Sequence, residues 1–579
     1  MASSPLVLLS SPHIGLNQQL HLLRKLESCQ SMKELKQFQA IVLKSKCLQT
    51  HLIISKILTF CALSPYGDIS HARSLLARIE NPTVSVYNSI LRGIAGREED
   101  PVANSLSLLE EMLQRGIFPD NYTFPLLIKV LADSRALAEG EAVHAHVIKM
   151  GFQFDVYVRN NFMRLYAVCG EVGSAQNLFD CFPDRDLVSW TTLISGYSKM
   201  GLLKEAVSVF LRLMDENLDV DKVTAVAVLS ACAKIGDLEL GKKLHGYINA
   251  KKVDLDVFAW NALVDMYAKC GDVTSAYKYF KKMPERNVVS WNSMISGFVH
   301  VGEFGKALSM FRKMQNTGIK PDIATLIGVL NSCANLGALD AGRWIHVYTI
   351  RSGFKADGSL GNALIDMYAK CGIIDQAMEV FGMMSCRDVY TYTSLIVGSA
   401  MHGQGDKALD IFSEMLRMGI KPNEVTFTGV LSACSHAGLV DIGLRHFGEM
   451  STLYGIKPTI EHYGCVVDMF GRAGLLEKAQ EFIRAMPIEP DAFIWGSLLG
   501  ACKIHGEVPL GEKAMEHLLD FGPDEDGSYV LMSNIYTSAN RRNDSTRVRK
   551  AMRKNRVKKT PGCSLIEIDG IVHEFRVRK

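Results

Sequence analysis

The sequence predicts an all-α protein, a right-handed solenoid of stacked helix-turn-helix repeats. The segment Trp190–Gly196 recurs as Trp291–Gly297 and again as Tyr392–Gly398, each time 101 residues further along the chain. A spacing that holds over two periods is the signature of a repeat architecture. Within each period, apolar residues follow helical spacing, and Gly and Pro residues punctuate the intervals between them.

Each period divides into three unequal units. The first full period consists of residues 187–221, 222–256 and 257–287, which are 35, 35 and 31 residues long. Every unit reads as two short helices. Because a pair of helices cannot bury its apolar face alone, neighbouring units must stack to form a continuous core.

The unit that starts at Val288 illustrates the two helices. The first is expected near 291–300, and Gly302 ends it. The second carries one apolar stripe, and the unit then closes on Gly318–Asp322, where a proline prevents the helix from continuing. The stripe consists of Ala307, Phe311 and Met314.

The composition is that of a folded protein, with 48% apolar and 22% charged residues among 579. The net charge is only +3, so any nucleic-acid surface must come from local placement of charge. No apolar run approaches the length needed to cross a bilayer, so no membrane partner is expected.

Fourteen cysteines are present, and none is in a Cys-x-x-Cys spacing. Cysteines and histidines instead recur with the repeat, which predicts packing positions rather than metal ligands or disulfides. We therefore expect no metal and no cofactor. The recurring sets are Cys169, Cys270 and Cys371; Cys232, Cys333 and Cys434; and His144, His245 and His346.

The unit sequences resemble those of the pentatricopeptide-repeat family of land-plant organelles. Val289–Gly297 (VSWNSMISG), Ala262–Gly271 (ALVDMYAKCG) and Gly318–Asp322 (GIKPD) carry the resemblance. Tetratricopeptide repeats have a uniform period of 34 residues, which conflicts with the unequal triplet. The subclass with long and short variant units fits, and the resemblance implies binding of single-stranded RNA, one base per unit.

The resemblance divides the chain into five regions. Ala492–Lys503 and Gly527–Tyr536 are similar to the family's two E motifs, and Thr560–Glu567 is similar to the start of its deaminase-like DYW domain, with Leu565 where Trp is usual. The predicted regions are 1–17, a transit peptide or a disordered start; 18–83, two degenerate units; 84–491, twelve units; 492–559, two E motifs; and 560–579, a truncated DYW-like segment.

The first 23 residues contain no Lys, Arg, Asp or Glu and are rich in Ser and Leu. Such a start is typical of an organelle transit peptide. Mitochondrial presequences usually carry arginine, and none precedes Arg24. The chloroplast is therefore the predicted location, and the mitochondrion is the alternative.

Three motifs suggest other chemistry. His505-Gly-Glu507 matches half of a zinc deaminase motif, but the Cys-x-x-Cys half is missing. Gly236–Lys243 nearly matches a P-loop, but Lys243 stands where Ser or Thr must bind Mg²⁺. No catalytic arrangement stands out, so the protein is not expected to be an enzyme. Residues 541–559 hold ten Lys or Arg and one acid, which predicts either phosphate or partner contact, or a solvated basic helix face.

In the family, the fifth and last residues of a unit decide which base is bound. These positions are polar in the standard and short units, whereas a packing role predicts apolar residues. A helix-start role for the fifth-position Asn is the alternative. The pairs of predicted base-reading residues are Asn88 with Asp120, Asn160 with Asp186, Thr191 with Asp221, Asn261 with Asn287, Asn292 with Asp322, Asn362 with Asp388, and Thr393 with Asn423.

The long units depart from this pattern. Their fifth residues Pro125, Val226 and Ile327 cannot hydrogen-bond a base edge, and Thr428, paired with Thr459, is the polar exception. Gly464 in the last short unit has no side chain that could hydrogen-bond a base. In the family, apolar second residues sandwich the bases, which here implies Val188, Phe258 and Val289.

These features lead to three hypotheses. The E motifs imply a site-recognition factor for cytidine-to-uridine editing of organelle transcripts, with a deaminase recruited in trans from another repeat protein or from the editing complex. An RNA-binding factor for splicing, stability or translation is the second. A helical scaffold that binds only proteins is the third, and it predicts no affinity for RNA.

Overall fold

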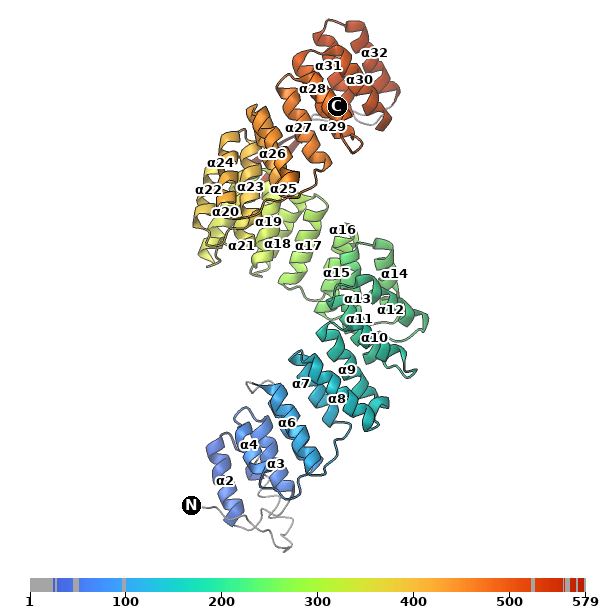
Figure 1. Ribbon diagram of the computed structural model, residues 1–579, viewed down its shortest axis with the longest axis vertical. Coiled ribbons are helices and arrows are strands. Elements are labelled where there is room, and N and C mark those ends of the chain that lie inside the picture. Colours follow the sequence, from blue (N-terminus) through green and yellow to red (C-terminus); the bar gives the residue numbers. More distant parts are fainter. Residues whose placement is uncertain are drawn as a thin grey trace. The chain divides into compact units, whose positions relative to one another are not determined.

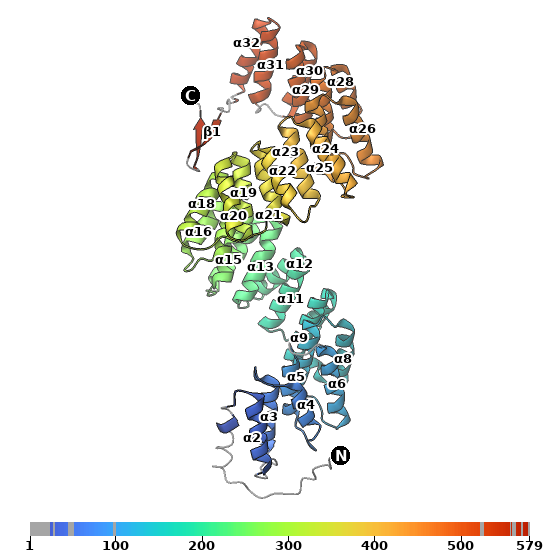
Figure 2. The same cartoon turned by 90° about the vertical axis from the view of Figure 1, so that its left-hand side faces the viewer.

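A computed structural model describes residues 24–26, 29–44, 51–95, 100–521, 526–555, 557, 563–568 and 571–576. The predicted transit segment 1–17 lies outside these residues. The chain divides into two compact units, 1–270 and 271–579, each a row of stacked helices (Figures 1 and 2). The prediction of an all-α solenoid is confirmed for both rows.

The first compact unit contains helices α2 to α15. Leucine, phenylalanine and isoleucine side chains from α2, α3, α4 and α5 are buried together at its start. The helices are α2 (Met32–Lys44), α3 (His51–Leu63), α4 (Ile69–Leu76), α5 (Val84–Ile94), α6 (Pro101–Gln114), α7 (Thr123–Asp133), α8 (Leu137–Lys149), α9 (Val156–Cys169), α10 (Val172–Asp180), α11 (Leu187–Lys199), α12 (Leu203–Asp215), α13 (Lys222–Ile235), α14 (Leu238–Ala250) and α15 (Val257–Lys269), with a 3₁₀ turn at Phe152–Phe154.

The second compact unit continues with α16 to α32. Its described helices are α16 (Val273–Lys282), α17 (Val288–His300), α18 (Phe304–Asn316), α19 (Ile323–Leu336), α20 (Leu339–Arg351), α21 (Gly358–Lys370), α22 (Ile374–Met383), α23 (Val389–Met401), α24 (Gly405–Arg417), α25 (Glu424–Ala437), α26 (Val440–Thr452), α27 (Ile460–Arg472), α28 (Leu476–Arg484), α29 (Ala492–His505), α30 (Val508–Phe521), α31 (Asp526–Ser538) and α32 (Arg542–Lys554).

The helix boundaries follow from local chemistry. In the unit from Val288, α17 runs to His300, Gly302 adopts a φ of 75°, and α18 buries Ala307, Phe311 and Met314, as predicted. A left-handed φ is open to glycine without steric cost, which explains the glycine stop. Within each compact unit, the first helix of one repeat packs on the first helix of the next, as α23 does on α25.

Two strands follow α32. The strands β1 (Cys563–Ile568) and β2 (Ile571–Arg576) form an antiparallel hairpin in which Cys563 pairs with Arg576 and Ile568 with Ile571. The hairpin falls in the segment predicted to be DYW-like. Among the described residues, none of the helices combines the length and apolarity required to cross a bilayer.

Candidate nucleic-acid interface

Most fifth-position asparagines lie one turn inside the first helix of a unit and contact the residue that ends the unit. Asn160 Nδ2 donates to Asp186 Oδ1 over 3.0 Å. The hydroxyl of Ser189, the third residue of the next unit, donates to Asn160 Oδ1 over 2.7 Å. We call this set of three side chains a polar triad. Its members are the fifth residue of a unit, the residue that ends the unit, and the third residue of the next unit.

The same polar triad recurs in three further units. The Nδ2 to Oδ1 distance is 3.1 Å for Asn88 and Asp120, 2.9 Å for Asn292 and Asp322, and 3.2 Å for Asn362 and Asp388. The structure therefore brings together four of the residue pairs predicted from sequence. The hydroxyls that complete these triads belong to Thr123, Thr325 and Thr391.

The unit-end residue also caps the next helix. Asp186 Oδ1 accepts the backbone N–H of Ser189 over 2.8 Å, and Asp322 Oδ1 accepts that of Thr325 over 2.9 Å. The fifth-position asparagine lies inside its helix, so the helix-start role falls to the unit-end residue instead.

Sequence reasoning missed the third member of the triad. The hydroxyl residue is buried and directs the asparagine amide, since an O–H donor beside Oδ1 turns the NH₂ group toward the aspartate. A Ser or Thr at the third place of every standard and long unit from residue 121 to 459 was the available signal. These residues are Thr123, Ser189, Thr224, Ser290, Thr325, Thr391 and Thr426.

The threonine units bond differently. Thr191 Oγ1 lies 2.5 Å from Thr224 Oγ1, and Thr224 in turn donates to Asp221 Oδ1 over 2.7 Å. Thr393 likewise lies 2.7 Å from the hydroxyl of Thr426. The unit-end residue is therefore reached through a hydroxyl rather than directly.

The predicted pair Asn261 and Asn287 falls on either side of the division between the two compact units. Asn261 is buried within α15 of the first unit. Asn287 caps α17 in the second unit and accepts the backbone N–H of Ser290. Each residue thus occupies the same place in its own element as the members of the other pairs.

The aspartates of the four triads are held in the ionised form. Partial burial raises the pKa of Asp186 and Asp322, but the hydrogen bonds from the backbone, asparagine and hydroxyl donors outweigh it and leave the pKa below the ordinary value. The same balance lowers the pKa of Asp120 and Asp388.

Each of these triads offers a donor and an acceptor side by side. Asn160 and Asn292 each have a second amide hydrogen that forms no hydrogen bond within the described part of the chain. The same holds for the Oδ2 atom of the aspartate that each asparagine contacts. An N–H and a carboxylate oxygen next to each other complement a planar edge that carries a carbonyl oxygen beside an N–H.

The second residues of many units form a row of exposed apolar side chains. Val188, Phe258 and Val289, predicted to contact bases, are 56%, 69% and 49% exposed. Exposed apolar side chains at a helix start lack a packing role, whereas they suit stacking against a flat ring. Counting from each unit start adds side chains that sequence reasoning did not name: Tyr122, Tyr157, Val223, Tyr390, Val425 and Phe493.

The long units lack the first and the third member of the triad, which are the fifth residue and the hydroxyl residue of the following unit. Their fifth residues Val226 and Ile327 are apolar, and the third residues of the short units that follow are apolar and buried as well. Those third residues are Val158, Ala259 and Leu360. Thr428 is again the exception, since its hydroxyl lies 3.2 Å from His462 Nε2.

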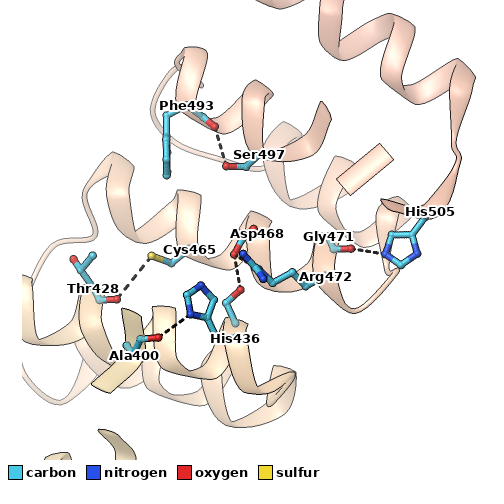
Figure 3. A network of polar contacts seen from close by, with 11 residues as sticks. Ala400, Thr428, His436, Cys465, Asp468, Gly471, Arg472, Phe493, Ser497 and His505 are labelled. Carbon is cyan, nitrogen blue, oxygen red and sulfur yellow. Dashed lines mark hydrogen bonds and ion pairs between the residues drawn. The ribbon is translucent and has the colours of Figure 1, made fainter. Parts of the chain in front are cut away.

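The end of the array differs from its middle (Figure 3). The ring of Phe493 occupies the space that a side chain on Gly464 would need, which explains the glycine at this fifth position. His505 Nε2 lies 2.9 Å from the carbonyl oxygen of Gly471 in the preceding unit, so this histidine joins two helical pairs. His436 makes the same kind of contact with Ala400.

The recurring cysteines and histidines occupy packing positions. Burial raises the pKa of Cys232, Cys333 and Cys434 to between about 11 and about 12, so these thiols stay protonated. The histidines are half-buried and each lies 2.9 Å from a tyrosine hydroxyl, as His346 does from Tyr368. Among the described residues, no group of three or more His, Cys, Asp or Glu could hold a metal ion.

The basic segment 541–559 contains arginines that form ion pairs as well as basic residues that form none in the described chain. Arg541 pairs with Glu512 and Asp544, Arg547 pairs with Asp544, and Arg549 donates to Ser533. Both interpretations of this segment therefore remain open. The basic residues of α32 that make no such contact in the described chain are Arg542, Lys550, Arg553 and Lys554.

Comparison with known proteins places these features in a family. The model of the PPR repeat family matches residues 185–234, 286–335 and 387–436, and the PPR repeat model matches 258–288, 362–389, 425–453 and 461–488. The E motif model matches residues 505–567, which overlaps the predicted 492–559 and ends inside β1.

Two relatives from Arabidopsis thaliana span almost the whole chain. A mitochondrial pentatricopeptide repeat-containing protein is 39% identical over 96% of this chain and 86% of its own length. A chloroplastic one is 40% identical over 95% of this chain and 78% of its own length.

Solved structures share the fold. The crystal structure of the maize pentatricopeptide repeat protein PPR10 has a TM-score of 0.52 and 15% identity, covering 94% of this chain and 98% of that one. The structure of PPR10 with an 18-nt psaJ RNA element has a TM-score of 0.53 and 16% identity, covering 93% and 87%.

Proposed function

Because the chain belongs to the pentatricopeptide repeat family, we propose that it binds one stretch of single-stranded organelle RNA and directs cytidine-to-uridine editing there. The polar triads carry this proposal. Within each compact unit, two triads present the same donor and acceptor pattern two repeats apart, which suits a polymer of flat hydrogen-bonding units.

The triad chemistry fits uracil, as it also fits cytosine, whose N4–H₂ donor lies beside the N3 acceptor. A uracil edge carries an N–H between two carbonyl oxygens, so it can accept from the asparagine amide and donate to the aspartate. The family's pairing rule agrees and assigns Asn with Asp to U, Asn with Asn to C, Thr with Asp to G, and Thr with Asn to A. Read from Asn88 to Asn423, the predicted RNA is U-x-U-G-x-C-U-x-U-A, where x marks a long unit.

The relatives support an organelle location. One carries a chloroplastic name and another a mitochondrial name. The uncharged, serine-rich first 23 residues favour the chloroplast. The maize protein PPR10, solved with an RNA element, shares the solenoid that would hold such a strand.

The editing role rests on the E motif. A zinc deaminase needs His-x-Glu and a Cys-x-x-Cys pair, and the 579 residues contain no such pair. His505 bonds to Gly471 and joins two helical pairs. We therefore assign the deamination step to a partner protein recruited through the region 492–559, and we propose that this chain is not itself an enzyme.

A gel-shift titration tests the RNA step. RNA carrying U-x-U-G-x-C-U-x-U-A should bind more tightly than the same bases in scrambled order, and no affinity for either would favour the protein scaffold. Transcriptome sequencing of a loss-of-function plant tests the editing step. One unedited cytidine with normal transcript ends supports it, whereas altered splicing or transcript level would support the second hypothesis.

A further inference from the structure

The C-terminal hairpin contacts a helix more than two hundred residues earlier in the chain. Glu567 of β1 accepts two backbone N–H groups of α20, that of Asp340 on Oε2 and that of Ala341 on Oε1, both over 2.8 Å. Both partners lie in the second compact unit (Figure 2). In a solenoid, helical pairs contact their neighbours, so a contact of this reach needs a separate explanation.

The two amides belong to the first turn of α20, where no intrahelical carbonyl is available to them. The equivalent helix α14 supplies its own acceptor, because Asp237 caps the N–H of Leu240. In α20 the same position is Ala338, which cannot cap. Glu567 thus does for α20 what Asp237 does for α14.

The groove beside this contact has a more apolar rim than the equivalent faces of α14 and α26. Asp340 and Ala341 line it together with Phe311 and Trp344. The outer face of α20 exposes Trp344, Val347 and Ile350. The equivalent residues are Lys243, Gly246 and Asn249 in α14, and Arg445, Gly448 and Ser451 in α26.

Glu567 also lies close to the junction between α19 and α20. Burial, and then the negative charge of Glu567, raise the pKa of the Cys333 thiol to about 12, while Arg312 acts in the opposite direction. Cys333 is in the last turn of α19. The carboxylate of Glu567 therefore lies between the end of α19 and the start of α20.

We propose that the start of α20, at the edge of the groove between α18 and α20, is the docking site of the chain's own C-terminal hairpin, and that Glu567 latches the hairpin there. The latch connects the region that follows the E-motif helices to the long unit 323–357. It lies at the far end of α19 from the fifth residue Ile327, about 15 Å along the helix at 1.5 Å per residue. The proposal does not depend on what the base-facing end binds.

Hydrogen–deuterium exchange of the full chain tests the latch. In Glu567→Gln one of the two acceptor oxygens becomes an NH₂ donor, so at least one of the amides of residues 340 and 341 should exchange about three- to thirtyfold faster, because losing an N-cap acceptor has an effect of this size. Exchange of the hairpin amides should rise with them. The capped start of α14 should not change, and Glu574→Gln, which removes the hairpin's other glutamate, is the matched control.

A rescue separates the latch from general loosening. Ala338→Asp installs the cap that α14 uses, which covers the amide equivalent to that of Ala341, so in the Glu567→Gln background it should restore slow exchange at 341 but leave the amide of 340 and the hairpin fast. Unchanged exchange in Glu567→Gln would overturn the proposal. Protection that appears only at high protein concentration would also overturn it, because the hairpin would then dock on a second copy.

Discussion

The standard and short units differ from the long units at two places, the fifth residue and the third residue of the following unit, while sharing one helical scaffold. Standard units such as 288–322 join a fifth-position asparagine to an aspartate and a buried hydroxyl. At the end of long units such as 222–256, the corresponding side chains are Val226 and Ala259, and the triad is absent. Both kinds bury apolar side chains from both of their helices.

This difference shows that the polar triad is not needed to stack a unit. Packing requires the buried apolar residues, which both kinds have, whereas the triad places hydrogen-bonding groups on a surface. A feature that the fold can omit at regular intervals is best explained by binding, since an unneeded buried polar network would otherwise be a liability.

The largest effect is expected from turning several triads into the long-unit form. Asn160→Val, Asn292→Val and Asn362→Val together should weaken binding to the predicted RNA by at least about a hundredfold, at about 1–3 kcal/mol for each lost base contact. A gel-shift titration measures it. The matched control replaces Pro125, Val226 and Ile327 by Ala, and an equal loss there would contradict the distinction between units.

A change of specificity is expected from Asp221→Asn. Asparagine can still accept from the Thr224 hydroxyl, as Asn423 does from Thr426, so the helix cap is preserved. The preference at that base should shift from G to A, by about 1–3 kcal/mol. Asn423→Asp should produce the reverse shift. If wild type and Asp221→Asn rank G- and A-containing RNAs alike, the reading positions are wrongly assigned.

Phe258→Ala should weaken binding of every RNA sequence to the same extent. Stacking of a base on an aromatic ring contributes about 1–3 kcal/mol and depends little on base identity. Titrations with matched and scrambled RNAs measure both affinities. Met383 is equally exposed but not at a second position, so Met383→Ala should have no effect. A loss confined to one sequence would argue against stacking.

Thr325→Val tests the third member of a triad. The loss of the hydroxyl should destabilise the protein by about 1 kcal/mol and relax the preference of Asn292 for U over C, because its amide is then held by Asp322 alone. Thr349→Val removes a buried hydroxyl outside the triads and should alter thermal stability alone. An unchanged base preference in Thr325→Val would exclude an orienting role.

The smallest effect concerns pH. The pKa of Asp186 and Asp322 in the folded protein lies below the ordinary value of 3.8. Their contribution to stability is therefore present above the unfolded pKa and is lost as pH falls through the folded one. Preference for U should be constant from about pH 5 to about pH 8, and thermal stability should fall below pH 3.8. A change of preference near neutral pH would contradict ionised triads.

Much of the fold followed from the sequence alone. The 101-residue spacing of the Trp190, Trp291 and Tyr392 segments and the glycine stops predicted the helical pairs, because helix periodicity and helix ends are local properties. The same spacing identified the fifth and last residues of each unit, so the pairs such as Asn160 and Asp186 could be named without coordinates.

Tertiary structure decided what lies between units. Whether Asn160 reaches Asp186 directly while Thr191 reaches Asp221 through Thr224 depends on side-chain length across a packed interface. The seat of Glu567 on α20 depends on the return of the chain over more than two hundred residues. A periodic sequence fixes each helical pair and its neighbours, but contacts between distant units arise only when the stacked chain brings them together in space.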